Sequence, residues 1–193
     1  SKNFKKITFI FCAIILMSAF SATKIKVETN LLDFFKRTSQ IQEDLKFIEE
    51  NLSGVGSLSI VVESKKIDAF KNPEALLIIE DIKNYLITFP EVDKTVSFND
   101  FIKEMNKSFH NENDTYYRIP EHKNQVSQFL LLYDSDDINE FITSDYNKAR
   151  IMVRINEHNS SVNKLLIENI RNHISSLNLK NLEIKVTGQA LQE

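Results

Sequence analysis

The residues of this chain that could bind a metal do not form a recognisable site. The densest acidic cluster is Asp134-Ser135-Asp136-Asp137, and alternating carboxylates can bind a hard cation such as Ca²⁺ through oxygen. The calcium-loop pattern fails, however, because no glycine follows to make the sharp turn and no acid occupies the closing position. We therefore interpret the cluster as the solvated, capping start of a short helix over about 137–143, and we predict no metal site.

Catalytic and cofactor signatures are also missing from the sequence. No two histidines are spaced for metal binding, and no serine lies in a glycine-flanked elbow. Three glycines are too few for a phosphate-cradling loop or a dinucleotide fingerprint. We predict that the chain is not an enzyme and holds no cofactor. The alternative, a small hydrolase, requires a serine, a histidine and a carboxylate that converge in the folded chain. The histidines are His110, His122, His158 and His173.

Aromatic and apolar side chains concentrate near the middle of the chain, where they could line a cleft for a hydrophobic ligand. The ordinary alternative is that they belong to the core. The residues concerned are Phe98, Phe101, Met105, Phe109, Tyr116, Tyr117, Phe129 and Tyr133. Within this set, our candidates for a substrate path are Phe101, Met105, Phe129 and Tyr133.

An unbroken apolar run of sixteen residues, Ile7 to Ala22, follows a basic start. At ~1.5 Å per residue it reaches about 24 Å, somewhat less than a bilayer core of about 30 Å. Flanking lysines can extend it by snorkelling to both interfaces, so we predict an N-terminal transmembrane helix over 1–23. A cleaved signal peptide is the alternative, because small residues end the run. Either interpretation sends residues 24–193 across a membrane.

Composition and length allow one substantial folded core, or two small ones, after this run. The 193-residue chain is 42% hydrophobic and 26% charged, with a net charge of −3. No clustered basic surface is visible, so nucleic acid is not expected as a partner. The single cysteine, Cys12, lies inside the apolar run, which excludes an intramolecular disulfide and a thiolate zinc site.

Hydrophobic periodicity predicts two strand-helix-strand units. A capping box at Ser39 starts a helix that ends near Leu52. The first unit follows, with a strand over 58–63, a helix from Asn72-Pro73 to Phe89, and a strand over 92–98. The second unit has a strand over 150–155, a helix over 162–177 and a strand over 182–187.

These units predict an α+β domain of the ferredoxin-like type, in which the helices cover one face of a four-stranded sheet. Residues 99–147 lie between the units and are too apolar for a linker. Short helices are expected around 101–105 and 126–133, besides the one over 137–143. Long insertions with their own secondary structure often hold the specific function of a common fold.

The order of several short stretches resembles the first periplasmic porter domain of resistance-nodulation-division (RND) superfamily exporters. The similarity is to the branch of the mycobacterial large membrane proteins (MMPL) and hopanoid transporters, and it covers essentially the whole chain. The stretches are VETNLLDFF, FIEENLSGVGSLSIVVES, FPEVDKTVSFNDFIKEMN, TSDYNKARIMVRI and EIKVTGQ. No strict catalytic signature is among them.

The resemblance implies a piece of a longer, proton-driven exporter of lipidic or hydrophobic molecules in the bacterial inner membrane. Residues after about 24 would then lie on the periplasmic side and form part of the substrate path. The implied partners are the membrane, the remaining domains of the same transporter and a hydrophobic substrate, and a homo-oligomer stays open. The alternative function is a membrane-anchored or secreted lipid-binding protein that works alone.

Overall fold

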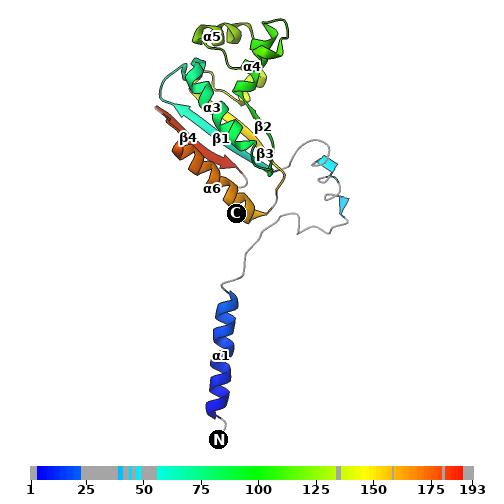
Figure 1. Cartoon of the computed structure of the whole chain (residues 1–193), viewed down its shortest axis with the longest axis vertical. Helices are drawn as coiled ribbons and strands as arrows, with labels where there is room; N and C mark the ends of the chain where they lie inside the picture. Colours follow the sequence, from blue (N-terminus) through cyan, green and yellow to red (C-terminus); the bar gives the residue numbers. More distant parts are fainter. Residues whose placement is uncertain are drawn as a thin grey trace.

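The computed structural model shows an α+β chain (Figure 1). It describes residues 4–22, 39–40, 44, 47–48, 56–133, 136–157, 159–179 and 181–188. The predicted helix over 39–52 falls largely outside these residues.

The N-terminal apolar run is helical. Helix α1 spans Phe4–Ala22, where the sequence predicts a transmembrane helix over 1–23. Within the described part of the chain, no helix has the length and apolarity needed to cross a membrane.

Four strands form one antiparallel sheet in the order β2-β3-β1-β4. The strands are β1 (Gly56–Ser64), β2 (Val92–Ser97), β3 (Lys148–Ile155) and β4 (Leu182–Gly188). Helix α3 (Pro73–Leu86) joins β1 to β2, and α6 (Ser160–Ser176) joins β3 to β4. Each unit's strands therefore flank a strand of the other unit, so neither unit can complete the sheet alone.

One face of the sheet carries the core. Leu58 and Ile60 on β1 lie opposite Val153 and Ile151 on β3, and all four side chains are fully buried. Helices α3 and α6 pack against each other and cover this face (Figure 1). The other face is polar and partly exposed, and there Arg150 Nε donates to Ser59 Oγ at 3.1 Å. The predicted alternation of the strands is confirmed.

The predicted helical insertion is also confirmed. Its helices are α4 (Phe98–Ser108) and α5 (Lys123–Leu132), with 3₁₀ turns η3 (Asp114–Tyr116) and η4 (Asp136–Glu140). The last turn is shorter than the helix expected over 137–143. A further 3₁₀ turn, η2 (Ala69–Lys71), precedes α3.

Strand β2 passes into α4 without a loop, because Ser97 ends the strand and caps the helix. Its hydroxyl accepts from Asn99 N at 3.3 Å, while the Asp100 carboxylate accepts from Ser97 N at 2.8 Å. This capping box satisfies two amide groups that a helix start leaves unpaired. The strand expected over 92–98 therefore ends at Ser97, one residue early.

A network of charges between α3 and α4 fixes the angle at which α4 leaves the sheet. Lys83 Nζ on α3 binds both oxygens of the Asp100 carboxylate. Lys103 Nζ on α4 binds Glu80 Oε1 on α3 at 2.7 Å. The buried Asn99 amide donates to the backbone oxygen of Leu76 at 2.8 Å.

Both lysines of this network are buried, and both are paired. Burial alone lowers the pKa of Lys103, but its hydrogen bond to Glu80 and the charges of Glu80 and Asp100 outweigh burial and raise that pKa. The ammonium therefore stays charged in the folded protein. Removing one partner of such a pair leaves an uncompensated charge in a poorly solvated place.

The first prediction concerns this network. Asp100→Asn should lower the free energy of unfolding by about 2–3 kcal/mol, because it leaves the Lys83 ammonium without its carboxylate partner and weakens the capping box at the start of α4. Glu104→Gln removes the same charge from an exposed position on the same helix and should change stability by less than about 0.5 kcal/mol. Urea denaturation followed by circular dichroism measures both. Equal stability of the two variants would contradict a structural role for the network.

Candidate functional site

An apolar pocket of about 290 Å³ lies between α4 and α5. All four substrate-path candidates from the sequence, Phe101, Met105, Phe129 and Tyr133, line it. The remaining lining residues are Glu104, Ser108, Phe109 and Leu132. The pocket lies entirely within the insertion and not on the sheet.

Helical spacing explains the α4 wall. Phe101, Met105 and Phe109 are four residues apart, so they lie one above another on one side of the helix. Met105 is 7% exposed and forms part of the floor, whereas Phe109 at the end of the helix is 54% exposed and forms the rim. The pocket is therefore deep beside Met105 and opens to solvent beside Phe109, at the end of the helix.

Helix α5 supplies the facing wall. The Phe129 ring is buried and stacks on Phe109 with ring centroids 5.0 Å apart and planes 5° from parallel. Tyr133 lies 6.4 Å from Phe101, centroid to centroid. Phe101 also contacts Phe141, which follows η4, at 5.4 Å. Aromatic pairs at these separations hold both walls in place.

The rim of the pocket exposes large apolar side chains to solvent. Leu132 is 69% exposed and lines the pocket, and its neighbour Leu131 is 83% exposed and does not. Leu132 and Phe109, which both line the pocket, form what we call the apolar rim. Exposed apolar side chains at the opening of a concave apolar pocket are a feature of ligand-binding grooves.

The other aromatic residues singled out in the sequence lie elsewhere. Phe98 is fully buried in the main core, with its ring 6.4 Å from Tyr146. Tyr116 stacks on His110 at 3.7 Å, and Tyr117 lies under the Lys103 ammonium at 5.1 Å. These side chains stabilise the insertion and do not line the pocket.

Sequence analysis missed three of the lining residues. Glu104 and Ser108 follow Phe101 and Met105 by three residues on the same helix, and Leu132 follows Phe129 by three. The i, i+3 spacing was therefore the signal that could have found them. The sequence candidates comprised only aromatic residues and methionine, so a glutamate, a serine and a leucine were not among them.

Two histidines in the described part of the chain, His173 and His110, have close contacts of their own. His173 Nε2 lies 3.0 Å from Asp81 Oδ2, and its ring stacks on Tyr85 at 3.9 Å, so it links α6 to α3. His110 Nδ1 contacts the backbone oxygen of Asn106 at 2.6 Å. Among the residues described, no three histidine, cysteine or acidic side chains are grouped to hold a metal. His158 and the start of the 134–137 cluster lie outside those residues.

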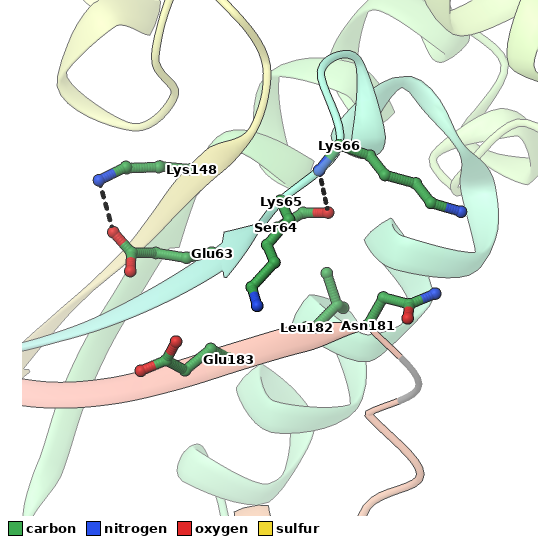
Figure 2. A pocket seen from close by; sticks show the side chains of 8 residues that line it. All are labelled: Glu63, Ser64, Lys65, Lys66, Lys148, Asn181, Leu182 and Glu183. Carbon is green, nitrogen blue, oxygen red and sulfur yellow. Dashed lines mark hydrogen bonds and ion pairs between the residues drawn. The ribbon is translucent and has the colours of Figure 1, made fainter.

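A second, polar pocket of about 410 Å³ opens where β1 and β4 meet (Figure 2). Glu63 lines this pocket and forms two ion pairs. Its carboxylate binds Lys148 at 2.6 Å and Lys185 at 2.8 Å. Lys65 and Lys66 extend on the side of the pocket away from Lys148 (Figure 2). The two ion pairs tie the edge strand β4 and the central strand β3 to β1.

The second prediction follows from this arrangement. Hydrogen bonds from Lys148, then Lys185, lower the pKa of Glu63 from 4.5 to about 2. Because the folded-state pKa lies below the unfolded one, the carboxylate's contribution to stability is complete above pH 4.5 and is lost as the pH falls toward 2.

Urea denaturation of the wild type and of Glu63→Gln tests this. The difference between their midpoints should be largest at neutral pH and should shrink between pH 4.5 and pH 2. Carbon-detected NMR of the Glu63 carboxyl should show the low pKa directly, and Lys148→Met should raise it. A carboxyl that titrates near 4.5 in the wild type would contradict the ion-pair geometry.

Comparison with known protein families and with curated proteins gives no match for this chain.

Proposed function

We propose that this chain is the first porter domain of an RND-type exporter of lipidic or hydrophobic molecules, similar to the MMPL and hopanoid-transporter branch. The pocket between α4 and α5 forms part of the substrate path. The domain lies on the periplasmic side of the bacterial inner membrane, and the rest of a longer protein supplies the membrane helices and the proton-driven step.

The observation that carries this proposal is the pocket itself. It is lined mainly by aromatic and aliphatic side chains, it is open to solvent, and its rim exposes Phe109 and Leu132. A soluble domain gains nothing in stability from leaving such residues in water. Exposed apolar surface of this kind is instead suited to receive a hydrophobic molecule.

The order of the strands supports the same proposal. Two strand-helix-strand units interleave as β2-β3-β1-β4, with both connecting helices on one face. This is the arrangement expected of a ferredoxin-like porter domain. Because α4 follows β2 directly, motion of the sheet would reach one wall of the pocket without a flexible linker.

The alternative is a stand-alone lipid-binding protein, anchored to a membrane or secreted. It rests on the same apolar pocket, which a carrier that works alone would use to hold its ligand. The reading frame downstream of Glu193 separates the two functions. A transporter requires further apolar spans of ~20 residues each, whereas a stop codon directly after Glu193 favours the lipid carrier.

Substitutions at two neighbouring residues, Leu132 and Leu131, test whether the pocket between α4 and α5 binds a hydrophobic ligand. Leu132→Glu should weaken binding of the neutral hydrophobic dye N-phenylnaphthylamine about fivefold, because a charge replaces apolar rim surface that the ligand would cover. Leu131→Glu makes the same chemical change one residue earlier, outside the pocket, and should leave the affinity unchanged. Fluorescence titration of the whole chain measures both.

In the full transporter, the same pair of variants should differ in the same direction. Leu132→Glu should reduce export, and Leu131→Glu should not, while both assemble in the membrane to the wild-type level. Equal dye affinity of the two variants would remove the pocket from the proposal. Equal export with unequal dye binding would leave a ligand-binding pocket that does not belong to a transport path.

A further inference from the structure

The apolar pocket contains a single fixed charge. Of its eight lining residues, all of them within the described part of the chain, only Glu104 carries a full charge at neutral pH. Ser108 and the Tyr133 hydroxyl are the other polar side chains there. A ligand in this pocket therefore meets aromatic and aliphatic surface together with one carboxylate, and no ammonium or guanidinium group.

The lysines nearest to Glu104 in the sequence are engaged elsewhere. Lys103 Nζ binds Glu80 at 2.7 Å, and Lys107 Nζ binds Asp114 at 2.8 Å. Within the residues that the structure describes, Glu104 forms no ion pair with either of them. Glu104 is exposed, so its carboxylate can attract an incoming cation.

The electrostatic field around the pocket has the same sign. Residues 99–147 contain ten acidic and four basic side chains, a formal charge of −6, whereas the whole chain carries −3. The insertion is therefore the acidic part of the molecule. Such a field attracts cations and repels anions before any contact is made.

We propose that the α4/α5 pocket selects cationic amphiphiles, which are molecules with one hydrocarbon tail and an ammonium-type head. The tail packs among Phe101, Met105 and Phe129, and the head lies beside Glu104 at the opening. The aromatic rings favour the same ligand, since ring faces attract ammonium groups. At about 290 Å³ the pocket is at the small end of ligand sites, which suits one tail and not a two-chain lipid.

This inference rests on the proposed function of the pocket, and it adds a charge preference that the function alone does not require. A pocket that received fatty acids or other anionic lipids would be expected to carry a basic residue at its opening. Here the opening carries an acid instead.

The experiment compares two ligands with the same tail and opposite heads. Dodecyltrimethylammonium and dodecyl sulfate, each below its micelle concentration, compete with N-phenylnaphthylamine on the whole chain at pH 7 and low salt. The ammonium compound should bind about fivefold more tightly. The preference should weaken at high salt, because screening acts on exposed charges.

Two single substitutions locate the effect. Glu104→Gln should abolish the preference, because the ammonium compound loses its charge partner while the sulfate has none to lose. Glu112→Gln removes an identical charge from the same insertion but outside the pocket lining, and it should retain most of the preference. Circular dichroism of both variants checks that these exposed substitutions leave the fold intact.

The possible results separate the charge preference, the role of Glu104 and the function of the pocket. Equal binding of the two dodecyl compounds would overturn the charge preference and leave the hydrophobic pocket in place. Equal losses in Glu104→Gln and Glu112→Gln would assign the preference to the general field and overturn the role of Glu104. Failure of the dye and of both dodecyl compounds to bind saturably would overturn the pocket's proposed function together with this inference.

Discussion

The placement of helix α4 depends on the paired charges that join it to α3. Lys83 and Glu80 on α3 bind Asp100 and Lys103 on α4, so each helix supplies one acid and one base. Such crossed pairs define both the separation and the rotation of two helices, because sliding either helix would break both pairs. The pairing need not add much net stability, since desolvation opposes it. Its main consequence is a fixed orientation.

That orientation determines where the pocket forms. With Asp100 and Lys103 directed at α3, the side of α4 that carries Phe101 and Met105 is directed at α5. Asp100 also completes the capping box at the end of β2, so the same residue fixes the start of the helix and its rotation. The sheet, the ion pairs and the pocket are thus mechanically connected over a short length of chain.

The elements that the sequence predicted are those whose periodicity is set by burial. Leu58, Ile60 and Val62 alternate because one face of β1 is covered, and the structure buries all three. The four pocket candidates were chosen by residue type, and the structure brings them together because Phe101 and Met105, like Phe129 and Tyr133, are four residues apart and share one side of their helix.

The charge network could not be predicted in this way. Lys83 and Asp100 are 17 residues apart, and Lys103 and Glu80 are 23 apart. A lysine on a helix ordinarily indicates a solvated surface, and nothing in its local sequence distinguishes a buried one. The Glu63 ion pairs could not be predicted from the sequence either. Lys185 is 122 residues away and becomes a neighbour of Glu63 only because β4 pairs with β1.

Negative charge is concentrated in one segment of the chain, the insertion. Residues 99–147 carry −6, so the remainder of the chain carries +3 to give the total of −3. On the polar face of the sheet, Arg150, Arg154 and Lys148 lie along one strand, while only Glu63 opposes them on β1. A chain whose charges were evenly mixed would dissolve equally well. Because the negative charge is concentrated in the insertion, a cation is attracted more strongly there than elsewhere on the chain, and the apolar pocket lies within that insertion.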